Sequence, residues 1–311
     1  MTIVIGTDEA GYGPKLGPLV ISATAWKLSE KLSWTDLYQS LSSVITDSYQ
    51  KSRSTPSRLC VADSKKIYQR KRGLTPLAQN LLPFVEYLYG PDSLYSLLTD
   101  DLSHPSTAQL LPDVDFARVS QAKKSLDNIF KKTNIRLLAI RSRLIEPPEF
   151  NSLLNHYGNK ATLLSVETLS LAKKILSDNP PPACTVLLCD KHGGRAHYAP
   201  LLQQIFEVPL VEPLVESQKT SRYRLTFNHS QKMEAHFSQS GESALPVALA
   251  SIASKLFREL AMKAFNSYWI QKLPHLLPTA GYPQDAKRFF AEIEPTMLAD
   301  KIPHETIWRK R

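Results

Sequence analysis

Two adjacent carboxylates, Asp8 and Glu9, stand near the start of the 311-residue chain, between an apolar run and a glycine-rich segment. The apolar run, residues 2–5, is typical of a strand, and Gly11 and Gly13 let the backbone approach a ligand closely. Acids repel a bare phosphate, but a divalent cation held between them reverses that repulsion. The segment therefore suggests a metal site and chemistry on phosphate esters.

Two other interpretations of this segment compete with a metal site. Asp and Gly are ordinary turn residues, so the segment could be a solvated turn. It could also be a nucleotide-binding glycine loop, but its spacing G-x-G-x-x-x-G, which ends at Gly17, departs from the usual G-x-G-x-x-G. Pro14 and Pro18 interrupt it, and no helical pattern follows directly to receive a pyrophosphate. The metal interpretation is the coherent one.

Asp190 and Glu259 are two further acids that could join the first pair. Asp190 ends the apolar run 186–189 in the same strand-to-glycine context, although it could simply cap the turn that follows. Glu259 shares a helix face with Ser251 and Lys255, so an ion pair on a solvated face is its simpler explanation. Four unpaired carboxylates would raise one another's pKa, which two divalent ions would prevent. Oxygen ligands without a Cys/His cluster favour Mg²⁺ or Mn²⁺.

Strand-like and helix-like segments alternate along the chain, which predicts the α/β class. The polar stretch 90–115 is typical of a loop, and the basic segment from Lys219 to Arg224 could extend a nucleic-acid surface or form a solvated loop. Continuous apolar strands suit a sheet that is covered on both faces. We predict strands over 2–5, 16–26, 135–144 and 186–189, and helices over 65–72, 76–89, 159–177 and 248–271.

The composition suits a globular protein with a basic surface. Hydrophobic residues make up 42% of the chain and charged residues 22%, and the net charge is +9. A basic surface suits a polyanionic partner, although solubility alone would also explain it. Cys60, Cys184 and Cys189 show neither disulfide nor zinc spacing, which suggests free thiols in a reducing compartment. With no signal peptide and no membrane-length apolar run visible, we expect a cytoplasmic protein.

A series of motifs along the chain resembles, in order, those of the type 2 ribonucleases H, the ribonuclease HII family. The segment from Gly6 to Pro14 is similar to the family's D-E-A-G-R-G-P turn, and residues 249–259 resemble its A-A-S-I-x-A-K-x-x-R-D helix. These two blocks are long and specific. The shorter blocks are Val61–Lys66, which resembles D-S-K-K, the strand Val186–Asp190, Gly281–Pro283 and Trp308–Lys310.

The resemblance implies a ribonuclease H-like fold, in which a mixed sheet is flanked by helices, with a C-terminal helical extension. It implies a catalytic domain over residues 1–272, with insertions near 27–57, 90–130 and 213–243. The tail, residues 273–311, would contribute to substrate binding.

The resemblance also implies a site and a reaction. Asp8, Glu9, Asp190 and Glu259 would be the catalytic residues and would hold two Mg²⁺ or Mn²⁺ ions for phosphodiester hydrolysis. The substrate would be the RNA strand of an RNA–DNA hybrid, or a ribonucleotide embedded in duplex DNA, and neither a membrane nor a protein partner is expected. Seven residues would bind the substrate: Gly11, Tyr12 and Gly13 at the 2′-hydroxyl, Ser64 and Lys65 at phosphates, Tyr282 at the ribonucleotide, and Lys255 on the long helix.

Two departures from the family pattern leave other functions open. Tyr12 replaces an Arg, which removes a guanidinium near the substrate, and Glu259 replaces an Asp, which moves a carboxylate by about 1.5 Å. Because Mg²⁺ demands near-ideal geometry, the chain could be a catalytically weak or inactive homologue that binds hybrid or duplex nucleic acid. A metal nuclease of the same fold with another substrate is the third alternative.

Overall fold

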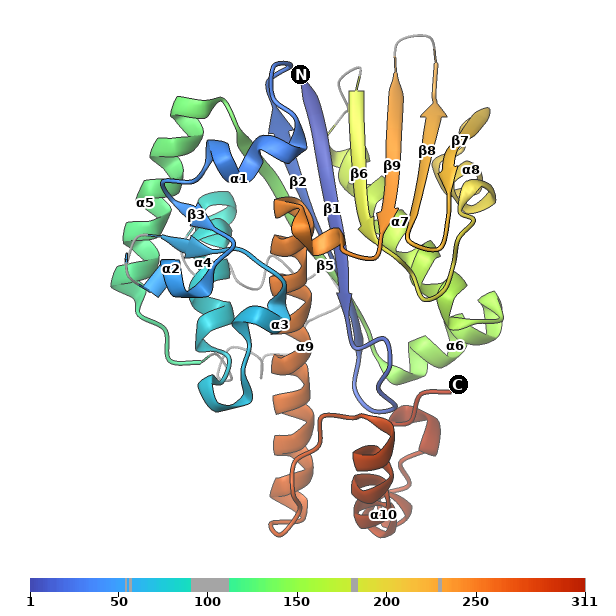
Figure 1. Ribbon diagram of the computed structural model, residues 1–311. Helices are drawn as coiled ribbons and strands as arrows, with labels where there is room; N and C mark the ends of the chain where they lie inside the picture. Colours follow the sequence, from blue (N-terminus) through green and yellow to red (C-terminus); the bar gives the residue numbers. More distant parts are fainter. Residues whose placement is uncertain (54, 56–57, 91–111, 180–183, 229–230, 311) are drawn as a thin grey trace.

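A seven-stranded mixed sheet forms the centre of the molecule (Figure 1). The computed structural model describes residues 1–53, 55, 58–90, 112–179, 184–228 and 231–310. The strand order is β5-β2-β1-β6-β9-β8-β7. The strands are β1 (Thr2–Ala10), β2 (Leu19–Leu28), β5 (Arg136–Ile145), β6 (Cys184–Asp190), β7 (Leu210–Glu216), β8 (Thr220–Thr226) and β9 (Lys232–Ser238).

The centre of the sheet is parallel and its two sides are antiparallel. β6 pairs in parallel with β1 on one side and with β9 on the other, while the pairs β1–β2, β2–β5, β9–β8 and β8–β7 are antiparallel. Thr7 lies opposite Cys189, and Asp190 lies opposite Ser238. Strands β1, β6 and β9 therefore end at the same edge of the sheet, and the acid pair that follows Thr7 lies at the end of β1.

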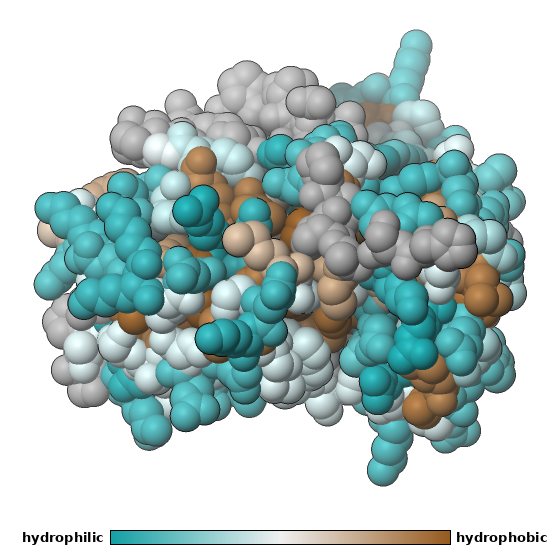
Figure 2. Space-filling view, turned by 90° about the horizontal axis from the view of Figure 1, so that it is seen from above, coloured by the Kyte–Doolittle hydropathy of each residue, from teal (hydrophilic) through white to brown (hydrophobic). Residues whose placement is uncertain are grey.

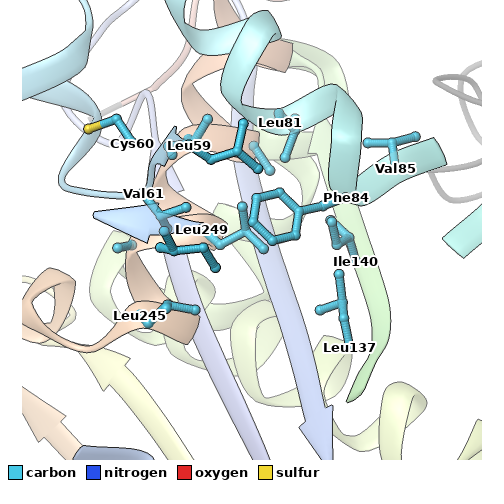
Figure 3. Close-up of a cluster of buried hydrophobic side chains, with 14 of the residues drawn as sticks. Leu59, Cys60, Val61, Leu81, Phe84, Val85, Leu137, Ile140, Leu245 and Leu249 are labelled. Carbon is cyan, nitrogen blue, oxygen red and sulfur yellow. The ribbon is translucent and has the colours of Figure 1, made fainter. Parts of the chain in front are cut away.

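Helices cover both faces of the sheet. Helices α4 (Thr75–Tyr89), α5 (Phe116–Thr133) and α9 (Leu245–Lys272) lie over one face, where α4, β5 and α9 contribute Phe84, Ile140 and Leu249 to a buried cluster (Figure 3). Helices α6 (Pro147–Tyr157), α7 (Lys160–Asp178) and α8 (Ala199–Phe206) cover the other face. Along β1 the side chains alternate, so that Val4 packs toward α9 and Ile5 toward α7.

The remaining elements are short, apart from one helix in the tail. They are η1 (Trp34–Asp36), α1 (Leu37–Ser40), β3 (Ile45–Thr46), α2 (Tyr49–Arg53), β4 (Leu59–Cys60), α3 (Ser64–Ile67), η2 (Arg70–Arg72), η5 (Gly241–Ser243), α10 (Pro283–Ala299) and η6 (His304–Thr306). Strands β3 and β4 pair in parallel beside the helices of the α9 face.

The first turn of α9 is held tightly against the sheet. A Cβ atom added at Gly6 would lie 2.2 Å from the carbonyl carbon of Pro246, so only glycine fits between β1 and α9. The Thr24 hydroxyl on β2 donates to the Pro246 carbonyl at 2.8 Å. These contacts fix the start of α9 relative to β1.

A third buried cluster joins the tail to the rest of the molecule. Helix α10 and the segment after it pack against the end of α9 and against Leu16, through Phe289, Ile293 and Ile307. The surface seen from above is mostly hydrophilic, with small hydrophobic patches between (Figure 2). Over the described ranges, no helix has the length and apolar character needed to cross a membrane.

The structure confirms the α/β class and most predicted elements, and corrects others. Strand β1 continues through the acid pair to Ala10, whereas the basic stretch 65–72 is divided between α3 and η2. The loop interpretation of Lys219–Arg224 is wrong for all but Lys219, because the residues from Thr220 onward belong to β8. Its side chains alternate between buried Tyr223 and half-exposed arginines. Most of the predicted loop over 90–115 lies outside the described residues.

Candidate functional site

Three predicted acids meet at the carboxyl ends of β1 and β6. Asp8 and Glu9 follow Thr7 on β1, and Asp190 follows Cys189 on the neighbouring parallel strand. Asp8 is 7% exposed and lies on the α9 face, where it interacts with the Ser251 hydroxyl. The geometry that a parallel pair imposes is enough to bring these carboxylates together.

Glu242 is a fourth acid at this site, and the sequence analysis missed it. It lies on η5, just beyond the end of β9, and the preceding Gly241 N–H donates to Asp190 Oδ1 at 3.3 Å. Gly241 packs so closely that an added Cβ would lie 3.1 Å from the Asp190 nitrogen. The signal for it was the apolar alternation of β9, which predicts a strand that ends shortly before Glu242.

The pKa values of all four acids are raised. Burial raises the pKa of Asp8 well above its usual range, and the charge of Glu9 adds to the effect. Burial and the charges of Asp190 and Glu242 raise the pKa of Glu9 to about 7. The pKa values of Asp190 and Glu242 are raised chiefly by burial, and in both cases Asp63 acts in the same direction. The site holds more negative charge than its surroundings balance.

Lys65 is the cation at this cluster. Its Nζ lies 3.7 Å from Glu242 Oε1, while its side chain is 81% exposed. Helix α3 carries it, capped by Asp63, which accepts from the Lys65 N–H at 2.9 Å. The Ser251 hydroxyl on α9 donates to the Ser64 hydroxyl at 3.1 Å, which ties α3 to α9. Ser64 is therefore a buried structural contact, and Lys65 is the accessible one.

Glu259 does not join the other acids. It lies eight residues beyond Ser251 on α9, a rise of about 12 Å along the helix. Its carboxylate accepts from Lys255 Nζ at 2.7 Å and Arg258 Nη1 at 3.3 Å, and from the Tyr68 hydroxyl at 3.4 Å. Glu259 therefore does not supply the expected fourth carboxylate of the site, because the rise of the helix carries it away from the strand ends.

Glu259 instead lines a groove beside α9. The groove has a volume of about 650 Å³, and Lys255, Tyr68 and Tyr282 also line it. The Lys255 ammonium lies 4.7 Å from the centre of the Tyr68 ring. Tyr282 is 55% exposed at the start of α10. Two of the residues expected to bind substrate, Lys255 and Tyr282, thus share one groove.

The glycine loop that follows β1 combines a strained position with an open one. Gly11 has a φ of +89°, in the left-handed region that favours glycine. Gly13 is exposed, and a Cβ placed there would meet no atom within 4 Å. Between them, Tyr12 packs into the α7 face beside Gly193, and burial and Glu9 raise its pKa. The Tyr12 ring is thus partly buried by packing against the α7 face.

The chemistry of the acid cluster fits a hard divalent cation. Its donors are carboxylate oxygens, and a cation among them would offset the repulsion that raises their pKa values. Within the described ranges, no three His, Cys, Asp or Glu side chains are placed so that they could hold one metal ion as they stand. The donor set fits in chemical type, and three of its side chains would have to move to bind one ion together.

Comparison with known proteins finds similar solved structures. No family model and no curated protein matches the chain. The Archaeoglobus fulgidus ribonuclease HII from a complex with PCNA is 15% identical, with a TM-score of 0.44, and the match covers 99% of this chain and 94% of that one. The Pyrococcus horikoshii ribonuclease H2 is also 15% identical, with a TM-score of 0.43 and coverage of 98% and 92%.

A third similar structure is Bst-RNase HIII in complex with Mn²⁺, at 12% identity and a TM-score of 0.43. The match covers 99% of this chain but 66% of that one. These neighbours all bear ribonuclease HII or HIII names, as the sequence resemblance suggested. One of these structures contains PCNA, a protein partner of a kind that the sequence of this chain does not indicate. With identities and TM-scores this low, function must be argued from this chain's own residues.

Proposed function

We propose that the protein is a divalent-metal-dependent endonuclease that cuts at ribonucleotides in RNA–DNA hybrids or in duplex DNA. The observation that carries this proposal is the convergence of Asp8, Glu9, Asp190 and Glu242 beside the glycine loop. When bound among these carboxylates, divalent ions would supply an activated water and stabilise the departing 3′-oxygen. Glu242 takes the place that the sequence analysis gave to Glu259.

The surrounding residues suit a nucleic-acid strand. Lys65 is exposed at the edge of the acid cluster and can meet a phosphate that approaches it. The groove with Lys255 and Tyr282 offers a cation and an exposed ring for the same strand further along. The exposed backbone at Gly13 leaves room for a sugar, whose 2′-hydroxyl distinguishes RNA from DNA. The net charge of +9 favours a polyanion.

A second candidate function is binding without cleavage. The observation that favours it is that, in the described part of the chain, no three of the acids are placed so that together they could hold one metal ion as they stand. Such a protein would still bind hybrid or duplex nucleic acid through Lys65 and the groove. Its binding would weaken steeply with salt, because released counterions supply most of the free energy.

A cleavage assay with matched variants separates the two functions. The protein would be incubated with Mg²⁺ or Mn²⁺ and three labelled duplexes: an RNA–DNA hybrid, a DNA duplex with one ribonucleotide, and an all-DNA duplex. We expect cleavage of the first two only. Asp8→Asn should abolish cleavage and Glu242→Gln should reduce it by about 100-fold or more, as expected when a reacting group is misplaced by about 1 Å.

Two controls make the assignment testable. Glu259→Gln should stay within about tenfold of the parent protein, and Glu294→Gln, an exposed acid on α10, should be unchanged. Loss of cleavage in Glu259→Gln together with full activity in Glu242→Gln would overturn the fourth position. No cleavage with either ion, alongside salt-sensitive binding of all three duplexes by fluorescence anisotropy, would establish the binding function instead.

A further inference from the structure

The segment around residue 309 lies directly on the glycine loop that follows β1. Leu16 pairs with Trp308 in an antiparallel bridge, and the Arg309 N–H donates to the Lys15 carbonyl at 2.9 Å. The Lys15 N–H in turn donates to the Gly281 carbonyl at 2.7 Å. The end of the loop beside the acid pair is therefore hydrogen-bonded to two segments of the tail, one at Gly281 and one at residues 308–309.

The Arg309 side chain reaches from this bridge to the carbonyl groups of the loop. It is fully buried, and its Nη2 donates to the Gly11 carbonyl at 2.6 Å and also to the Pro14 carbonyl. Its guanidinium lies over the Phe150 ring, 4.6 Å from the ring centre. The ring contact and the hydrogen bonds together hold the Arg309 side chain in place.

Arg309 is also an unusual group to bury at this point. Its Nε and Nη1 atoms are buried without a hydrogen-bond partner. A second buried arginine, Arg258 of α9, approaches the loop so closely that a Cβ at Gly11 would lie 2.5 Å from its Nε. Burial and the charge of Arg258 lower the pKa of Arg309 to about 9. Packing alone would be served better by an apolar side chain, so the arginine needs another explanation.

That explanation lies in the direction of the loop peptides. In a trans peptide, the C=O and N–H groups point in opposite directions. Because the Gly11 carbonyl points at Arg309, the N–H of the same peptide, which belongs to Tyr12, points away from it. Arg309 therefore lies on the carbonyl side of this peptide, while the loop is exposed at Gly13, where a ligand can approach.

We propose that Arg309 is a positioning residue that orients the Gly11–Tyr12 peptide, so that the Tyr12 N–H meets the ribonucleotide of the substrate. The assignment rests on the nuclease function proposed above. Arg309 touches no substrate in this scheme. It acts through the loop, and it sets how strongly a ribonucleotide is preferred over a deoxyribonucleotide.

The test compares Arg309→Met and Arg309→Lys with Arg288→Met, which changes a partly exposed arginine on α10 that pairs with Asp285 and Glu292. Affinities are measured without divalent metal, for a DNA duplex with one ribonucleotide and for the same all-DNA duplex. We expect Arg309→Met to lose the preference for the ribonucleotide while its affinity for all-DNA changes less than about twofold. Its kcat should fall by about 100-fold. Arg309→Lys, which keeps one donor, should recover part of both losses.

Amide hydrogen exchange over residues 9–17 tests the inference without any cleavage. Exchange in this segment should quicken in Arg309→Met and stay unchanged in Arg288→Met. An Arg309→Met protein that is only less stable, with the parent's duplex preference and exchange in this segment, would overturn the inference. If the parent protein cuts nothing, the nuclease function fails by itself, while the exchange data still decide whether Arg309 orders the loop. If Arg309→Met does not fold, Arg309→Lys carries both measurements.

Discussion

The charge crowding at the acid cluster predicts an unusual dependence of stability on pH, which Glu9→Gln should remove. The pKa of Glu9 is raised from 4.5 to about 7 in the folded protein, chiefly by burial and by Asp190. Between these two values the folded state binds more protons than the unfolded state. The free energy of unfolding should therefore fall as the pH rises through this window.

The size of the effect follows from the same two values. One pKa unit corresponds to about 1.36 kcal/mol, so the interval from 4.5 to about 7 amounts to about 3 kcal/mol at most. Because Glu9 is partly accessible to solvent, we expect about 1–3 kcal/mol. Above pH 7.5, Glu9→Gln should be more stable than the parent protein by this amount, and near pH 4.5 the two should differ little.

Urea unfolding at several values between pH 4.5 and 8, in buffers with a chelator, measures this difference. Glu294→Gln, on the exposed side of α10, serves as the matched control and should keep the parent's pH slope. Added Mg²⁺ or Mn²⁺ at pH 8 should raise the unfolding temperature of the parent more than that of Glu9→Gln. Identical pH slopes in the parent protein and in Glu9→Gln would refute the electrostatic account of the cluster.

Two further predictions concern the elements that hold the site in place. Gly6→Ala should destabilise the protein by about 3 kcal/mol or more in urea unfolding, because the new Cβ would meet the Pro246 backbone at 2.2 Å. Gly194→Ala, where a Cβ meets nothing within 4 Å, should change stability by less than about 0.5 kcal/mol, and equal losses in the two would contradict the packing argument. Lys191→Met should cost about 3 kcal/mol by thermal unfolding, because the buried ammonium donates to the carbonyls of Arg195 and Ser217 and to the Ser221 hydroxyl. Lys232→Met, at an exposed lysine of β9, is its control, and a similar loss in both would show that the buried bonds contribute little.

The strand ends could be predicted from the sequence because parallel pairing is a strong constraint. Asp8 and Asp190 each follow a continuous apolar run, and such runs belong in the buried centre of a sheet. Once β1 and β6 lie side by side in parallel, their last residues must lie at the same edge. Neither inference needed knowledge of the rest of the chain.

The fourth acid could not be predicted in the same way. Glu242 lies in a three-residue 3-10 helix, and its position depends on β9, whose alternating apolar residues fall within the insertion that is expected near 213–243. Glu259 belongs to a motif that is easily recognised, but its place along α9 is set by helical rise and not by motif order. The contact between the tail and the glycine loop could not be predicted either, because an interaction between residues 11 and 309 has no local sequence pattern.

That contact also bears on when the site can form. Gly11 and Arg309 are 298 residues apart in the chain. At about 5–20 residues per second, a ribosome needs roughly 15–60 s to synthesise the part of the chain between them. During that time the emerging protein can already contain the acid pair of β1, but the loop beside it lacks its partner. The site can therefore be completed only after residue 309 has been synthesised, and a chain released before that point would carry the acids without the ordered loop.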